Sequence, residues 1–266
     1  MRRSRFFWGI IVILIGVFLL LNTLGWIPAN SWSFFWPVVL ILLGVWFLLG
    51  PYLYRRNTAE METLSIPLEG TQQGRVRIDF GAGKLELNAA ANAGELASGT
   101  CYGGVEKELR RSGALAELRL HPPVDFMVPP FFMNTSGFQW QLGLSREIPL
   151  ELELHTGAGE SLLDLRDLKV SELRLETGAS ANRVILPAQA GFTQAHIKSG
   201  AASVEIQVPD GVAGRIHIES GLAGIKVDTS RFLPRGEKEY ESPDYASAAN
   251  RAEITIETGV GSLDIR

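Results

Sequence analysis

Cysteine and histidine are the scarcest chemistry-bearing residues of this sequence. Its 266 residues contain one cysteine, Cys101, which excludes an intrachain disulfide. The four histidines (His121, His155, His196 and His217) fall at no metal-ligand spacing. The sequence also lacks a Gly-x-Ser-x-Gly elbow, a His-Glu-x-x-His motif and a Walker loop. These absences predict a protein that is not an enzyme and that holds neither metal nor cofactor.

Acidic residues are missing from the first 56 positions, which instead contain two apolar runs, Phe6–Leu21 and Phe34–Tyr54. A bilayer core is crossed by roughly 20 mostly apolar helical residues, and tryptophan and tyrosine near the ends of such runs favour the interface. Residues 1–56 are therefore expected to form a transmembrane helical hairpin with spans at about 6–24 and 34–54. A cleaved signal peptide is the less favoured alternative, because no small-residue cleavage site follows the first run and a second span comes at once.

Positive charge flanks this hairpin but is absent from the link between its runs. Arg2, Arg3 and Arg5 precede the first run, and Arg55 and Arg56 follow the second. Because positively charged loops stay in the cytoplasm, these arginines are expected to anchor a topology with both termini, and the following domain, on the cytoplasmic side. Arginines that merely reach from a span to the interface would fit either orientation.

The remainder of the chain has the opposite charge. Residues 57–266 hold 20 of the 25 Lys and Arg and all 29 Asp and Glu, giving a net charge of −9. Such a domain is not expected to bind nucleic acid or an anionic lipid leaflet by electrostatic attraction. About 210 residues are ample for a hydrophobic core.

A repeat dominates residues 146–266. An alternating strand pattern ends in Thr-Gly or Ser-Gly, and small residues then lead into a second strand pattern. Alternation with period two indicates half-buried strands, and a spacing near 21 residues is typical of a β-solenoid whose copies bury their apolar faces by stacking. A phosphate loop is disfavoured because no helix follows these glycines. The expected structural corners are Gly157, Gly178, Gly200, Gly221 and Gly259, with an earlier relative at Gly81.

Residues 57–145 lack this regular repeat and predict an antiparallel β lead-in, and an insertion is expected at 231–250 before the last copy. The lead-in ends in a segment rich in proline and aromatic residues, which excludes a long regular element. That segment either caps the solenoid or forms a partner surface through Phe126, Phe131, Phe132, Phe138 and Trp140. The expected lead-in strands are Thr63–Leu68, Gly74–Phe80, Lys84–Asn88, Glu95–Tyr102, Gly104–Arg110 and Ala114–Leu120.

The two parts resemble a known set of bacterial proteins. The runs FFWGIIVILIGVFLLLNTLGWIP and SFFWPVVLILLGVWFLLG resemble the LiaI–LiaF-type transmembrane region over about residues 5–50. The part from IDFGAGKLEL through LETGAS is similar to the toast-rack, adhesin-like β-solenoids, a likeness that covers most of residues 62–266. The resemblance implies a multi-pass protein of the bacterial inner membrane that takes part in the cell-envelope stress response. It transfers no catalytic residues.

Two functions follow as expectations. The first is a non-enzymatic accessory protein that contacts the lipid bilayer and a membrane protein such as a two-component sensor kinase. The second is a membrane-tethered scaffold or adhesin-like homo-oligomer that assembles through free strand edges at the solenoid ends. The sequence thus predicts a mixed fold: a two-helix transmembrane hairpin followed by an all-β domain, a β-solenoid of short stacked strands.

Overall fold

A computed structural model describes residues 61–123 and 138–266 of the chain, which form an all-β unit. The predicted hairpin, with its five arginine anchors, lies outside these residues. Within the two described ranges, no helix has the length and apolar character needed to cross a membrane.

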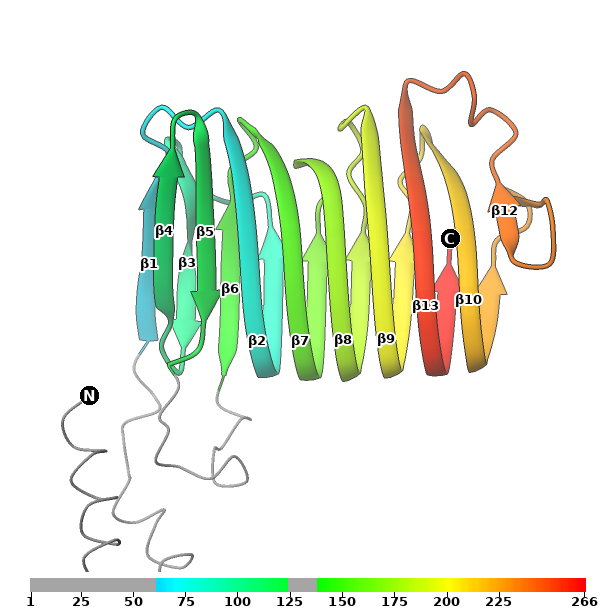
Figure 1. The fold of residues 1–266 in the computed structure, drawn as a ribbon, viewed down its shortest axis with the longest axis horizontal. Helices are drawn as coiled ribbons and strands as arrows, with labels where there is room; N and C mark the ends of the chain where they lie inside the picture. The colour runs from blue at the N-terminus through cyan, green and yellow to red at the C-terminus, as the bar shows by residue number, and fades with distance from the viewer. Residues whose placement is uncertain (1–60, 124–137) are drawn as a thin grey trace, which may run out of the picture. The chain divides into compact units, whose positions relative to one another are not determined.

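The core architecture is a stack of U-shaped rungs (Figure 1). Each rung is one long strand that runs down one arm, bends at a corner glycine and returns along a second arm. Neighbouring rungs pair in parallel along both arms, so the molecule has a first-arm layer and a second-arm layer. The rungs are β2 (Gln73–Asn88), β7 (Pro149–Asp164), β8 (Lys169–Ile185), β9 (Phe192–Gln207), β13 (Asn250–Ile265) and β10 (Val212–Val227) in spatial order.

The core lies between the two arms. The period-two alternation of the sequence turns one side chain inward and the next outward, so inward residues of successive rungs stack in continuous rows. One such row in the first arms consists of Ile78, Leu154, Leu175, Ile197, Ile256 and Ile218, all at most 3% exposed. Burial of this kind stabilises by roughly 1.5–3 kcal/mol per large side chain, and a rung gains it only from its neighbours.

The rung before the predicted repeat is complete, which corrects the domain boundary expected at residue 146. The segments Gly74–Phe80 and Lys84–Asn88 are the two arms of β2, which pairs in parallel with β7 through both arms. The solenoid therefore begins at β2. The sequence pattern did not reveal that β2 is a rung, because the next rung follows only after some 60 residues.

Those intervening residues build the first end of the stack. In the second-arm layer, β1 (Met61–Pro67) pairs antiparallel with β3 (Glu95–Tyr102), and β3 pairs antiparallel with β6 (Gln139–Leu144). In the first-arm layer, β4 (Glu106–Ser112) pairs antiparallel with β5 (Leu115–His121). The predicted antiparallel lead-in is thus only partly right, because β5 and β6 join β2 in parallel.

The final rung in sequence is not the final rung in space. β13 lies between β9 and β10 and is in register with both. A free edge expected at a solenoid end is therefore not formed by β13: its second arm has a neighbour on each side, and the end of the stack is β10. The order follows from the excursion 228–249, which is long enough to carry the chain past β10 and back.

That excursion, expected as an insertion at 231–250, partly covers β10. It contains β11 (Leu233–Pro234) and β12 (Glu239–Glu241), and β12 pairs antiparallel with Arg215–His217 of the first arm. Phe232 is fully buried against Gly214, where a Cβ would lie only 2.9 Å from the phenyl ring. The excursion therefore caps the first arm of β10, whereas among the described residues its second arm pairs with β13 alone and has no strand on its outer edge.

Candidate interaction surface

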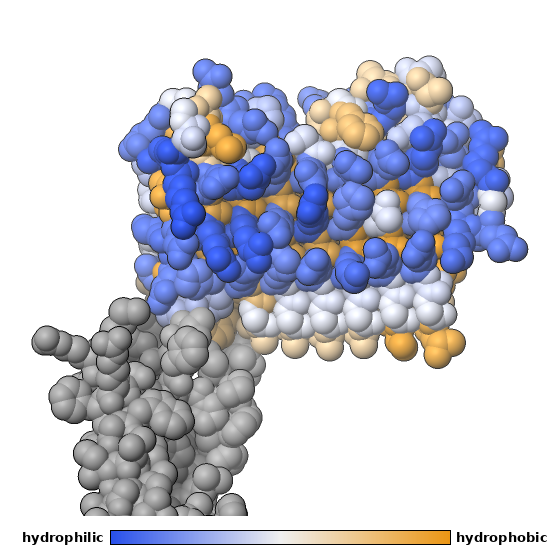
Figure 2. Space-filling model, viewed as in Figure 1, coloured by the Kyte–Doolittle hydropathy of each residue, from blue (hydrophilic) through white to orange (hydrophobic). Residues whose placement is uncertain are grey.

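The outer face of the first arms is an array of charged side chains. Outward positions of neighbouring rungs form rows, and opposite charges often lie side by side within a row. Arg75 Nε lies 2.8 Å from Glu151, and Arg77 Nη1 lies 2.9 Å from Glu153. Figure 2 shows these hydrophilic side chains gathered over the face that the first arms present. Each such exposed pair stabilises the fold by at most about 1 kcal/mol. Together the pairs form a regular pattern of charge that is suited to contact with a charged partner.

Two carboxylates of this array have a lowered pKa, which favours their ionised form. Burial tends to raise the pKa of Asp79, but hydrogen bonds from Arg77 and Arg119 outweigh it, so the pKa lies below its ordinary value. The hydrogen bond with His155 is the main cause that lowers the pKa of Glu153, and Arg77 adds to it. Asp79 lies on β2 and Glu153 on β7, and Arg77 forms an ion pair with each of them.

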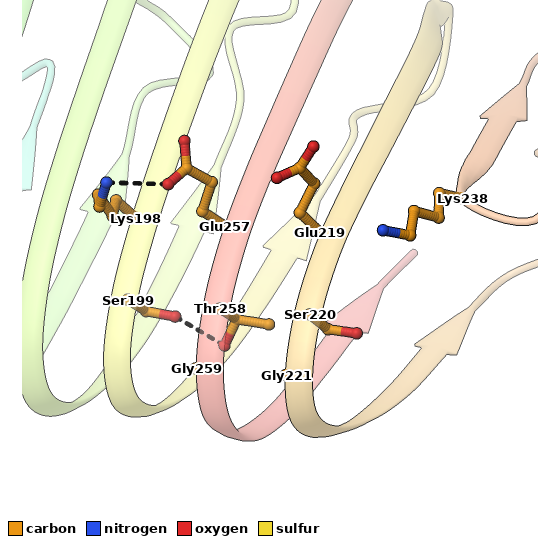
Figure 3. Close-up of a pocket in the computed structure, with 9 residues that line it drawn as sticks. All are labelled: Lys198, Ser199, Glu219, Ser220, Gly221, Lys238, Glu257, Thr258 and Gly259. Atoms are coloured by element: carbon orange, nitrogen blue, oxygen red, sulfur yellow. Dashed lines mark hydrogen bonds and ion pairs between the residues drawn. The ribbon is translucent and has the colours of Figure 1, made fainter.

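The opposite end of the array contains a shallow hollow of about 390 Å³ (Figure 3). Lys198 of β9 contacts Glu257 of β13 at 2.9 Å, and Glu219 of β10 is the register partner of Glu257. Lys238, from the excursion, lies on the other side of Glu219 in Figure 3. Hydroxyl and glycine residues make the floor of the hollow: Ser199, Thr258, Ser220, Gly221 and Gly259.

The hollow offers charge and hydroxyl groups but little enclosure. It has two carboxylates that are neighbours in the ladder and two lysines that flank them, an arrangement that balances charge within the surface. Within residues 61–123 and 138–266, no group of three or more His, Cys, Asp or Glu is arranged to hold a metal ion. The geometry is suited to contact with a protein surface rather than to enclosing a small molecule.

The bends form a second surface, a narrow apolar ridge. The six corner glycines lie one above another, and a Cβ on Gly157 would sit 2.2 Å from the carbonyl oxygen of Gly81. The residue after each glycine points outward from the bend, and these residues are Ala82, Ala158, Ala179, Ala201, Val260 and Leu222 in spatial order. Leu222 is 83% exposed, so the ridge is most apolar at β10, where Figure 2 is orange.

The aromatic segment was expected either to cap the solenoid or to form a partner surface, and the two of its residues that the structure describes pack into the core. Trp140 is fully buried beside Phe80, with ring centroids 5.1 Å apart, because it points into the core from β6. Phe138 packs against the same core. These two residues therefore belong to the packing of the first end of the stack. Phe126, Phe131 and Phe132 lie outside the described residues.

Three histidines on the outer face of the rungs do not contact one another. His196 and His217 share a row but Thr255 lies between them, and His155 lies in a different row, between Glu153 and Glu176. Cys101 is buried in β3, and burial together with the charge of Glu62 raises the pKa of its thiol to about 12. The sequence did not reveal the hollow, since β13 brings Glu257 next to Glu219 from 38 residues away.

These observations define a class of protein: a parallel β-solenoid with an open second-arm edge and a charged outer face, attached to an apolar amino-terminal region. A family model for the N-terminal domain of toast_rack matches residues 55–207, more than half of the chain. The protein belongs to the toast-rack family, which confirms the resemblance inferred from its sequence. A model for the LiaI-LiaF-like transmembrane region matches residues 6–48 and marks the chain as a membrane protein.

One solved structure shares the fold. A provisionally assigned cell adhesion protein from Clostridium sporogenes ATCC 15579 has a TM-score of 0.70 and 23% identity, covering 77% of this chain and 98% of its own. A provisionally assigned adhesin from Bacteroides fragilis NCTC 9343 covers 78% of this chain and 97% of its own, with a TM-score of 0.30 and 7% identity. At these identities the first likeness shows the fold alone, and the second carries no argument. The comparison with curated proteins found no match.

Proposed function

We propose that this protein is a non-enzymatic, membrane-anchored accessory protein of the bacterial cell-envelope stress response, which acts by contacting a membrane partner such as a two-component sensor kinase. The observation that carries the proposal is the patterned outer face of the first arms, fixed on a rigid stack of rungs. A solenoid offers extended rows of side chains at set spacings, which suits recognition of another protein. The two family matches support attachment to the membrane.

The proposal is tested by reversing charges on the outer face and measuring capture of the kinase. In cells under cell-wall stress, the tagged full-length protein is cross-linked and captured, and a membrane histidine kinase is expected among its partners. Replacing two exposed carboxylates of the face, Glu176→Lys with Glu257→Lys, is expected to reduce capture of the kinase strongly. Capture of no kinase, or capture that this variant leaves unchanged, would contradict the proposal.

Loop carboxylates provide the matched control. Asp167 and Asp210 are exposed at the end of the stack opposite the bends, between β7 and β8 and between β9 and β10. The double change Asp167→Lys with Asp210→Lys alters net charge by the same amount but leaves the outer face intact. Kinase capture by this variant is expected to match that of the native chain, which separates a local contact from a general charge effect.

A self-assembling scaffold is the second candidate, and the free second arm of β10 favours it. Full end-to-end stacking would also need a free first arm, and β12 covers part of that arm. Sedimentation of the full-length protein in detergent at increasing concentration tests this candidate: a single species of one copy would contradict it.

A further inference from the structure

The outer edge of the second arm of β10 carries much less charge than the β4 edge at the other end of the stack. The β4 edge carries Glu106, Lys107, Glu108, Arg110 and Arg111, and charged side chains discourage strand pairing. The second arm of β10 has only one charged residue, Lys226, between Gly221 and Val227. In the part of the chain that the structure describes, no strand pairs with its outer edge.

The backbone groups on that edge are directed away from the stack. The N–H of Asp228 donates to the carbonyl oxygen of Ile265 on β13 at 2.9 Å. Because successive N–H groups of a strand point to opposite sides, those of Lys226 and Gly224 also face β13, whereas those of Ala223, Ile225 and Val227 face outward. Among the described residues, this edge therefore presents a regular set of outward N–H donors, with the matching carbonyls, for one more parallel or antiparallel strand.

The apolar side chains beneath this edge are also uncovered. Ile225 continues an inward row through Leu263 and Val204, which are 1% and 2% exposed, yet Ile225 itself is 40% exposed. Val227 continues the next inward row through Ile265 and Ile206 and is only partly buried. An added strand with apolar residues at these two register positions would complete both rows.

The width of the space beside the second arm of β10 favours a single strand over a complete rung as its occupant. The first-arm layer extends past β10 by β12 and β11, whereas the second-arm layer stops at β10 (Figure 1). The resulting step is two strands wide, about 10 Å at the usual strand spacing. A complete rung of a second copy would collide with β12 and β11. A single extended segment fits beside the second arm of β10 without this collision.

We propose that the second arm of β10, residues 223–227, is a strand-acceptor edge that binds an extended segment of a protein partner by β-strand addition. The segment has apolar side chains at alternate positions, next to Ile225 and Val227, and an acidic side chain next to Lys226, whose side chain is 82% exposed. The proposal rests on the proposed function only in taking the partner to be a protein.

The second arm of β13 provides a probe with the required chemistry. Its residues Leu263, Asp264 and Ile265 already pair with Ile225, Lys226 and Val227 from the inner side. A labelled synthetic peptide of residues 260–266, VGSLDIR, is titrated into the full-length protein in nanodiscs and followed by fluorescence anisotropy. Saturable binding is expected. Two control peptides should bind at least about tenfold more weakly: one with both apolar residues replaced by asparagine, and one N-methylated at alternate amides.

A pair of protein variants locates the site. Ile225→Lys places a charge at the inward position of the edge and is expected to reduce peptide affinity at least about tenfold. Leu222→Lys adds the same charge to a side chain on the bend ridge and should leave the affinity within about twofold. Circular dichroism of both variants establishes that they fold, and N-methylation of the peptide tests the edge without altering the protein.

Three outcomes would overturn the proposal: no saturable binding, equal binding of the N-methylated peptide, or an effect of Leu222→Lys as large as that of Ile225→Lys. Dimerisation of the protein alone that Ile225→Lys abolishes would also overturn it, in favour of a second copy as occupant. The peptide titration contains no kinase. Peptide binding without kinase capture in cells would therefore support the strand-acceptor edge and reject the kinase as the partner.

Discussion

At the residue scale, the corner glycines differ in how closely the backbone of the neighbouring bend approaches the position that a Cβ would occupy. Gly157, Gly178, Gly259 and Gly221 each direct the Cβ position at the carbonyl oxygen of the preceding rung in space, at 2.2–2.8 Å. Gly81, on the first rung, meets nothing within 4 Å. At Gly200 the carbonyl oxygen of Gly178 lies 3.3 Å from the Cβ position, a looser approach. Close stacking of one bend on the next therefore requires glycine at four of the six bends, and the first bend does not require it.

Gly157→Ala is expected to lower the free energy of unfolding by about 2 kcal/mol and the melting temperature by roughly 4–8 °C, because the new methyl group collides with the backbone of Gly81. Urea unfolding and calorimetry measure both. The matched control is Gly81→Ala, which should be neutral or slightly stabilising since alanine reduces the entropy of the unfolded chain. Equal losses from the two changes would show that stacking is not the cause.

Asp79→Asn tests the charged array. The pKa of Asp79 is lower in the folded protein than its ordinary value of 3.8, so its stabilising contribution is present above pH 3.8 and is lost as pH falls through the folded pKa. The variant is expected to be less stable than the native chain by on the order of 1 kcal/mol at pH 7. The two stabilities should converge at the acid end of a urea-unfolding series. Asp210→Asn, which changes a fully exposed carboxylate, should follow the native curve throughout.

At the element scale, the position of β13 between β9 and β10 determines which side chains are neighbours on the outer face. Ser203 of β9 and Ser262 of β13 face each other, with their hydroxyl oxygens 2.8 Å apart. The double variant Ser203→Cys with Ser262→Cys is expected to form a disulfide readily under mild oxidation, because register partners on adjacent strands lie within disulfide range. Non-reducing mass spectrometry of a digest identifies the bridge. Buried Cys101 does not compete.

The matched control for this bridge is Ser203→Cys with Gly224→Cys. If the rungs followed sequence order, β10 would lie next to β9 and residue 224 would face residue 203. In the observed order, β13 separates them, so this pair should stay reduced under the same conditions. A disulfide in the control and none in the first variant would reverse the order of the last two rungs.

Local pattern predicted the strands well but could not order them. Alternation and glycine spacing predicted the rungs and their corners, because each rung buries every second residue in the same way. The place of β13 depends on pairing between segments 38 residues apart, and any rung can chemically pair with any other. Trp140 shows a related limit: a tryptophan at the end of a segment rich in proline and aromatic residues fits either a cap or a partner surface until Phe80 from β2 packs against it.

At the scale of the whole molecule, sidedness determines which partners can reach the outer face. The sequence places positive charge at both ends of the predicted hairpin and none in its link, which predicts a cytoplasmic solenoid. A cysteine appended after Arg266, which is exposed, reports the location of the solenoid. In intact cells, this cysteine should be protected from a membrane-impermeant maleimide and should react after lysis.

Cys101 serves as the internal control for this labelling. Maleimide reacts with the thiolate, and burial raises the pKa of the Cys101 thiol to about 12. The native chain should therefore stay unlabelled even in lysed cells while it is folded, and label on the extended chain can be assigned to the new cysteine. Labelling of the extended chain in intact cells would place the solenoid outside the cytoplasmic membrane. A cytoplasmic kinase domain could then not contact the first-arm face, and the partner would have to be extracellular or carry an external segment.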